Sequence, residues 1–121
     1  MLKMNKQYSF FIGRYQPLHE GHIAIIRKVL DEGKNVCIAL KDIPKRETDP
    51  FNIQERINMF RDVFKDELDD GSMILMSVPD IEEVCYGRTV GWGMRQIEVD
   101  KEIEEISATK IREQLEREGK L

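Results

Sequence analysis

The stretch from residue 8 to residue 30 constrains the fold more than any other part of the chain. An apolar run at residues 8–12 ends in Gly13, and apolar residues recur at helical spacing from Ile23 onward. Between them stands GRYQPLHEGH (residues 13–22), which contains both histidines of the chain, His19 and His22. Residues three apart share a helix face, and the free N–H groups at a helix N-terminus attract anions. The stretch therefore predicts a strand, a tight turn, and a helix whose N-terminus binds phosphate between two imidazoles.

Two short segments carry a resemblance to a known family. GRYQPLHEGH resembles the first signature of the HxGH nucleotidyltransferase (cytidylyltransferase-like) superfamily, and ISATKIR at residues 106–112 resembles its second signature. Members transfer a nucleoside monophosphate from ATP or CTP to an acceptor phosphate and release pyrophosphate. The GRYQP lead-in is most similar to the nicotinamide-nucleotide adenylyltransferase branch. Both signatures occur in the expected order, whereas the middle of the chain matches more loosely.

The remaining pattern predicts a small Rossmann-like α/β domain with a mainly parallel sheet flanked by helices. Residues 36–40 are nearly all apolar, as in a strand covered on both faces by helices, and residues 73–78 read as a third strand. Asn52 and Glu55 have the spacing of a capping box at the start of one long helix that ends near residues 69–71. The buried stripe of that helix is expected at Ile53, Ile57, Phe60 and Phe64. A last helix is expected to begin at Ser107, with Ile111 and Leu115 on its inner face.

Residues 80–106 are harder to interpret. Segments 83–88 and 96–103 could both be strands, but a crossover helix needs about a dozen residues, and none fits between residues 78 and 84. Members of the resembled family usually have further elements here that help to form the acceptor site. The sequence therefore leaves the acceptor open.

Composition excludes several classes of protein. A chain of 121 residues favours one domain spanning 1–121. A net charge of -4 argues against a protein that grips nucleic acid through a basic face. No apolar run approaches the ~20 residues of a membrane span, and residues 1–7 lack the apolar core of a signal peptide. With only two cysteines, a disulfide framework is not expected, and the predicted location is the reducing cytoplasm.

The resemblance assigns roles in the first signature. It implies that His19 and His22 bind the triphosphate and stabilise the transition state around the α-phosphate, and that Arg14 contacts phosphate. Gly13 permits the tight turn, and Gly21 leaves space between the imidazoles. A zinc site is the alternative, because HEGH is one residue short of HExxH, but no third ligand stands at a suitable distance. Together with one candidate outside the signatures, Arg88, the predicted nucleotide-binding residues are Gly13, Arg14, Tyr15, Gly21, His22, Arg88, Ser107, Thr109 and Arg112.

The second signature has an unusual charge pattern for a helix start. Lys110 stands where a capping box would place Glu or Gln, and Arg112 follows closely. Two cations in a first turn oppose the helix dipole by ~0.3–1 kcal/mol each, a cost that a bound polyanion would offset. The resemblance implies that this turn binds the β- and γ-phosphates through backbone N–H groups, the hydroxyls of Ser107 and Thr109, and Arg112.

Basic residues also cluster after the second predicted strand, at Lys41, Lys45 and Arg46, with Arg56 just beyond. Lys41 is the third catalytic candidate, because it ends a strand at the sheet edge where α/β proteins bind ligands. Lys45 and Arg46 are alternatives for neutralising a phosphate there, and solvated loop charges are the alternative for all three. Arg88 and Trp92 stand among glycines and could contact a phosphate or a base, or form a simple glycine-rich turn. Mg²⁺ is expected to arrive with the nucleotide, since it rests largely on phosphates and water, so no protein metal ligand is predicted.

The predicted function is therefore nucleotidyl transfer from ATP to a small phosphorylated acceptor. CTP stays open as the donor, and a cytidylyltransferase of the glycerol-3-phosphate type has a similarly short chain. The alternatives are a catalytically silent nucleotide-binding module in a larger assembly and a hydrolase that transfers the nucleotide to water. A homo-oligomer is expected, because a neighbouring copy could complete the acceptor site of so short a chain.

Overall fold

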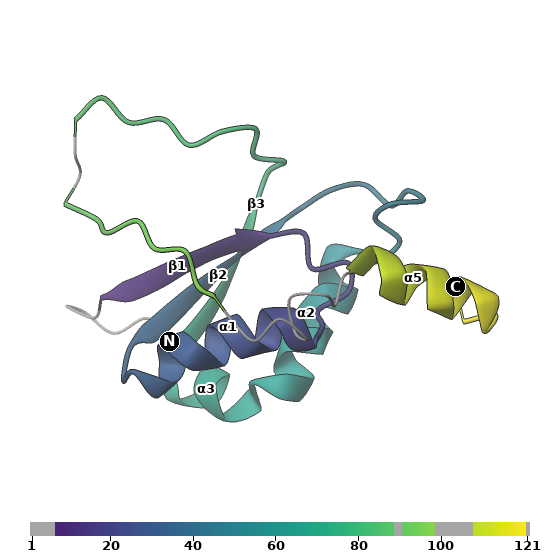
Figure 1. Cartoon of the computed structure of the whole chain (residues 1–121), viewed down its shortest axis with the longest axis horizontal. Helices are drawn as coiled ribbons and strands as arrows, with labels where there is room; N and C mark the ends of the chain where they lie inside the picture. The colour runs from purple at the N-terminus through teal and green to yellow at the C-terminus, as the bar shows by residue number, and fades with distance from the viewer. Residues whose placement is uncertain (1–6, 89–90, 99–107, 121) are drawn as a thin grey trace.

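The computed structural model describes residues 7–88, 91–98 and 108–120. Three strands form a parallel sheet in the order β1-β2-β3, with helices between them (Figure 1). In chain order the elements are β1 (Tyr8–Gly13), α1 (Glu20–Asp31), β2 (Asn35–Lys41), α2 (Ile53–Val63), α3 (Lys65–Asp70), β3 (Met73–Val78) and α5 (Ala108–Arg117). This is the predicted Rossmann-like α/β domain. None of the described helices is long and apolar enough to cross a membrane.

One face of the sheet forms the hydrophobic core. Register places Phe11, Ile38 and Leu75 side by side across the three strands. The helices α1, α2 and α3 all lie on this side (Figure 1). The buried cluster comprises Tyr15, Ile26, Val29, Val36, Ile38, Leu40, Phe60, Phe64 and Met73. The core thus joins the sheet to α1 and α2, the two helices that flank the carboxyl ends of β1 and β2.

The opposite face carries no helix among the described residues, so the prediction that residues 36–40 are covered on both faces by helices was wrong. Two right-handed crossovers that advance in the same direction across a sheet place their helices on the same side. Phe10 and Met76 on the open face are 57% and 44% exposed. The small side chains of Cys37 and Ala39 between them are nevertheless buried, which explains why β2 is apolar throughout.

The predicted long helix is divided in two. Its start is as expected, because Asn52 Oδ1 accepts from the N–H of Glu55 at 2.8 Å and Glu55 Oε1 accepts from the N–H of Asn52 at 3.1 Å. Phe64 leaves the helical conformation between α2 and α3, with φ -115° and ψ 34°. The Phe64 ring is fully buried, and the Arg27 guanidinium lies 4.5 Å from its centroid. Burial of this ring accompanies the break in the helix.

In segment 79–98, of which residues 79–88 and 91–98 are described, the first part extends away from the sheet and the second leads back toward α1 (Figure 1). Residues 83–88 are not a strand, and neither are residues 96–98, while 99–103 lie outside the described residues. Neither residues 83–88 nor residues 96–98 pair with an edge strand of the sheet, β1 or β3. The segment is anchored where Arg95 pairs with Glu32 and where Lys28 Nζ donates to the Glu98 carbonyl at 2.9 Å.

Candidate active site

The two histidines cap the N-terminus of α1. His19 is the N-cap, and its Nδ1 accepts from the Gly21 N–H at 3.0 Å. Reciprocally, His22 Nδ1 accepts from the His19 N–H at 3.2 Å. This is a capping box in which imidazoles replace the usual hydroxyl and carboxylate. Because both Nδ1 atoms accept, each neutral ring carries its proton on Nε2, which is therefore a donor that the cap does not use.

The electrostatic setting keeps both imidazoles neutral. The rings stack with centroids 3.8 Å apart and planes 22° from parallel. Burial lowers the pKa of His19, and burial followed by repulsion from His19 lowers the pKa of His22 to about 4. At neutral pH the site thus presents two Nε2–H donors without charge repulsion between the rings. A bound polyanion would raise both pKa values, so triphosphate binding is expected to be coupled to proton uptake.

The lowered pKa of His22 predicts an acid-sensitive fold. As pH falls below 6.5, the ordinary histidine pKa, the unfolded chain takes up a proton that the folded His22 refuses until about pH 4. Unfolding free energy should therefore decline over this window by on the order of 2–3 kcal/mol, and be unaffected by His22 above pH 7. Urea unfolding at several pH values measures this.

The matched variant is His22→Gln, because glutamine at this helix position can still complete a capping box. It should show a shallower decline between pH 6.5 and 4 than the wild-type protein. The pKa values of the buried or paired carboxylates of Asp49 and Glu55 lie below their ordinary values of 3.8 and 4.5, so these groups act at lower pH. Identical pH profiles for both proteins would contradict the assignment.

Tyr15 packs between the histidine pair and the hydrophobic core. Its ring is buried and meets His22 edge-on at 4.8 Å and Phe60 edge-on at 4.9 Å between centroids. Burial raises the pKa of the Tyr15 hydroxyl. Tyr15 has a positive φ of 51°, which turns the chain sharply out of β1. The described geometry places Tyr15 as a wedge between the core and His22, and its contact with nucleotide stays a prediction.

Gly13 makes room for that wedge. A Cβ at position 13 would lie 3.1 Å from two atoms of the Tyr15 ring, which is itself held between His22 and Phe60. Gly13→Ala is therefore expected to lower stability by about 1–3 kcal/mol, as overpacking does, and to displace His22. Gly93→Ala is the control, since nothing lies within 4 Å of its added Cβ. Thermal unfolding should separate the two variants, and equal melting temperatures would rule out the wedge.

The helix of the second signature lies against the loop of the first. In α5, the Arg112 side chain is buried, and its Nη1 donates to the carbonyl oxygen of Gln16. Gln16 is itself fixed by Phe51, with Nε2 donating at 3.0 Å and Oε1 accepting at 2.9 Å. Figure 1 shows the start of α5 beside the turn that leads into α1. Thr109 lies in the first turn of α5, while Ser107 lies outside the described residues.

Arg14 and Lys41 lie at the carboxyl ends of β1 and β2, as predicted for phosphate contacts. Their side chains pair with carboxylates: Arg14 Nη1 is 3.5 Å from Asp49 Oδ1, and Lys41 Nζ is 3.0 Å from Asp80 Oδ1. Burial raises the pKa of Asp49, but hydrogen bonds from Arg46 and Thr48 and the charge of Arg14 outweigh it and lower that pKa. The Lys41–Asp80 pair reaches solvent on both sides, and such pairs contribute only about 0–1 kcal/mol, so phosphate can compete for Lys41. The Asp49 side chain is fully buried, whereas that of Arg14 is 44% exposed.

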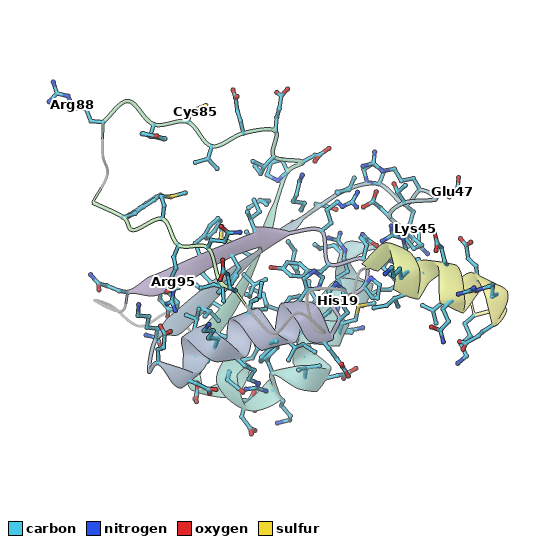
Figure 2. The ribbon with its side chains drawn as sticks, in the orientation of Figure 1. His19, Lys45, Glu47, Cys85, Arg88 and Arg95 are labelled. Carbon is cyan, nitrogen blue, oxygen red and sulfur yellow. The ribbon has the colours of Figure 1, made fainter. Side chains whose placement is uncertain are left out.

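Arg88 is not brought to this group of residues. Figure 2 shows Arg88 and Cys85 on the extended part of segment 79–98, on the opposite side of the molecule from His19. Trp92 in the same segment is 75% exposed, so it is not the packed tryptophan of a compact turn. Roles for Arg88 and Trp92 in nucleotide binding stay predictions.

Sequence reasoning missed Arg56, which it grouped with the exposed basic residues of the neighbouring loop. Arg56 belongs to α2, is fully buried, and donates to the main-chain carbonyls of Arg14 and Lys41. The available signal was its spacing. Position 56 is three residues from Ile53 and four from Phe60, on the stripe predicted to face the core.

In the described part of the chain, no three His, Cys, Asp or Glu side chains lie close enough together to hold a metal ion. The arrangement instead offers two imidazole donors at the N-terminus of α1, with Arg112 docked on the loop that precedes it. Arg14 and Lys41 add two cations at the carboxyl ends of β1 and β2. Such a set suits a polyanion such as a triphosphate.

Comparison with known proteins matches the amino-terminal part of the chain, which contains the two histidines. The profile of the family described as cytidylyltransferase-like matches residues 10–74. The chain is 40% identical over 77 residues to the nicotinamide-nucleotide adenylyltransferase of Caldivirga maquilingensis, covering 61% of this chain and 43% of that protein. Enzymes of the same name from Methanococcus vannielii and Thermococcus sibiricus are 40% identical over 53 residues and 32% over 76 residues.

These alignments are partial. They cover 42% and 60% of this chain, and 31% and 41% of the Methanococcus and Thermococcus proteins. The chain therefore matches less than half the length of these relatives. No solved structure matches the chain significantly.

Proposed function

This chain belongs to the cytidylyltransferase-like family of nucleotidyltransferases, and we propose that it transfers AMP from Mg·ATP to a small phosphorylated acceptor, releasing pyrophosphate. The observation that carries the proposal is the imidazole capping box of His19 and His22. It holds two Nε2–H donors at a helix N-terminus, next to a buried arginine of the second signature. A triphosphate carries several negative charges, and a group of hydrogen-bond donors and cations of this kind can bind it.

Nucleotidyl transfer demands mainly positioning and charge stabilisation. The acceptor phosphate oxygen attacks the α-phosphorus in line, the bond to the bridging oxygen breaks, and pyrophosphate leaves with the electron pair. The Nε2–H groups of His19 and His22 stabilise charge on the α-phosphate and bridging oxygens. Arg112 and the first turn of α5 hold the β- and γ-phosphates, and Lys41 neutralises the α- or acceptor phosphate. Mg²⁺ bound to the triphosphate supplies additional charge neutralisation.

The names of the relatives favour ATP as donor and nicotinamide mononucleotide as acceptor. A cytidylyltransferase using CTP and glycerol 3-phosphate is the main alternative reaction. The two are separated by a matrix of ATP or CTP with each acceptor, in Mg²⁺, with pyrophosphate release as readout. Release that requires one donor and one acceptor supports the proposal. Release without any acceptor would instead show a hydrolase.

Thermal stabilisation provides an independent readout of binding. A ligand at a hundredfold excess over Kd adds about 2.7 kcal/mol to the unfolding free energy. A shift with ATP but no turnover with any acceptor would favour the second candidate, a nucleotide-binding module. One observation favours that candidate, namely the position of Arg88 away from His19. No shift with ATP or CTP would contradict the nucleotide site itself.

We also propose that the protein forms a homo-oligomer. Large apolar side chains are exposed on the open sheet face and on segment 79–98: Phe10, Ile12, Met76, Val84, Tyr86, Trp92 and Met94. An aromatic side chain buries about 150–250 Å², so this set represents on the order of 800 Å² per copy, the size of a standard interface. A second copy related by a two-fold axis would cover both surfaces on each chain.

Light scattering coupled to gel filtration tests this assembly. We expect a dimer for the wild-type protein and a monomer for the double variant Phe10→Ser with Trp92→Ser. The control is Arg61→Ser, an exposed position on α2. A monomeric wild-type protein at all concentrations would overturn the proposal.

A further inference from the structure

Arg56 makes an unusual set of contacts at the centre of the molecule. One nitrogen, Nη1, donates to the carbonyl oxygen of Arg14 at 2.9 Å and to that of Lys41 at 2.7 Å. Its Nε donates to the Asn52 carbonyl at 3.3 Å, within its own helix. Arg14 follows β1 directly and Lys41 ends β2, so one guanidinium group joins the ends of two strands and the start of α2.

This arrangement is costly if its purpose is only to fill the core. The Arg56 side chain is 0% exposed, and among the described residues no carboxylate forms an ion pair with it. In the described part of the chain its Nη2 has no hydrogen-bond partner. Burial lowers the pKa of the guanidinium, although the charges of Asp42 and Asp49 act in the opposite direction. An apolar side chain of similar volume on the same helix stripe would avoid that desolvation. What an apolar residue cannot provide is the bridge between the two carbonyl groups.

The bridged residues are the two whose side chains are expected to contact phosphate. After Arg14 the chain turns sharply through Tyr15, and after Lys41 it enters the loop that contains Asp49. In β1 and β2 the register ends at the pair Gly13 and Leu40, so Arg14 and Lys41 lie one residue beyond the last pair of the ladder. At this point the hydrogen bonds from Arg56 join their two carbonyls.

We propose that Arg56 is a positioning residue, which sets the separation of Arg14 and Lys41 so that both cations meet the phosphates of one nucleotide. This role rests on the proposed function, because it presupposes a triphosphate at the carboxyl ends of β1 and β2. Arg56 itself is buried beneath those residues and acts through their main chain. Its loss should therefore impair nucleotide binding more than its effect on stability explains.

The test compares Arg56→Lys with Val36→Ala, another fully buried change, at the amino end of β2 and so at the other end of the strand from Lys41. Arg56→Met serves as a second variant that removes the charge. Three quantities are measured for each: the melting temperature, the Kd for Mg·ATP, and the carbonyl ¹³C chemical shifts of Arg14 and Lys41. The chemical shifts need no ligand and report the bridge directly.

We expect both Arg56 variants to weaken ATP binding roughly 10- to 100-fold, the scale associated with small misplacements of binding groups. Both carbonyl resonances should shift in these variants. Val36→Ala should lower the melting temperature while leaving Kd and those resonances nearly unchanged. If the loss of ATP affinity were proportional to the loss of melting temperature in every variant, the control included, Arg56 would be only a structural residue and the inference would be overturned.

Failure of the proposed function gives a different result. If the wild-type protein binds neither ATP nor CTP, the nucleotide site is absent and the positioning role falls with it, whatever the carbonyl shifts show. If the wild-type protein binds ATP and Arg56→Lys binds it equally well, only the inference about Arg56 is wrong.

Discussion

Replacing His19 with asparagine is expected to remove most of the nucleotidyl transfer rate while leaving the fold intact. Asparagine is a good N-cap, so its side-chain oxygen can accept the Gly21 N–H that His19 Nδ1 accepts in the wild-type protein. It cannot replace the Nε2–H donor that the proposed mechanism assigns to the α-phosphate. Losing one such donor typically lowers kcat about 10²–10³-fold, which a pyrophosphate-release assay measures.

The companion variant His19→Ala separates the two roles of the ring. Alanine removes both the cap and the donor, so we expect the same loss of rate together with about 1 kcal/mol less stability. Urea unfolding should therefore rank the proteins as wild type, asparagine variant and alanine variant, with the first two close together. A His19→Asn protein that retains the wild-type rate would show that the imidazole is a cap and nothing more.

The amino-terminal half of the fold could be predicted from the sequence because its signals are local. Gly13 closes an apolar strand, Gly33 has the positive φ of a residue just past a helix end, and Asn52 with Glu55 forms the capping box that its spacing indicates. The strand at Met73–Val78 has the predicted bounds. The docking of α5 on the first-signature loop also agrees with the expectation that both signatures share one site.

The parts that could not be predicted depend on contacts between distant segments. Nothing in a local pattern indicates that Arg14 pairs with Asp49 or Lys41 with Asp80. Arg56 is buried because it lies beneath the ends of β1 and β2 and donates to the carbonyls of Arg14 and Lys41. Because arginine is charged, the residue type did not indicate that this position belongs to the apolar stripe of the helix. Residues 96–103 alternate polar and apolar residues as a strand would, but a strand forms only where a neighbouring strand is available, and the described part, 96–98, has no strand beside it.

Arg112→Ala is expected to lower the affinity for Mg·ATP and the stability of the protein together. In the wild-type protein the buried Arg112 side chain ties α5 to the carbonyl of Gln16, next to the helix N-terminus capped by His19. A hydrogen bond to a charged group contributes about 1.5–3 kcal/mol, which corresponds to roughly 10- to 150-fold in affinity if the contact with phosphate is lost. Isothermal titration with ATP and thermal unfolding measure the two effects.

Arg117→Ala is the matched control, because it removes the same charge from the exposed last turn of α5. If net charge alone governed binding, both variants would weaken ATP binding equally. If α5 only completes the fold, Arg112→Ala would lower the melting temperature without changing Kd at a temperature where the protein is folded. A fall in affinity confined to Arg112→Ala requires that the second signature bind the phosphates where α5 meets the Gln16 loop, and so ties triphosphate binding to the docking of α5.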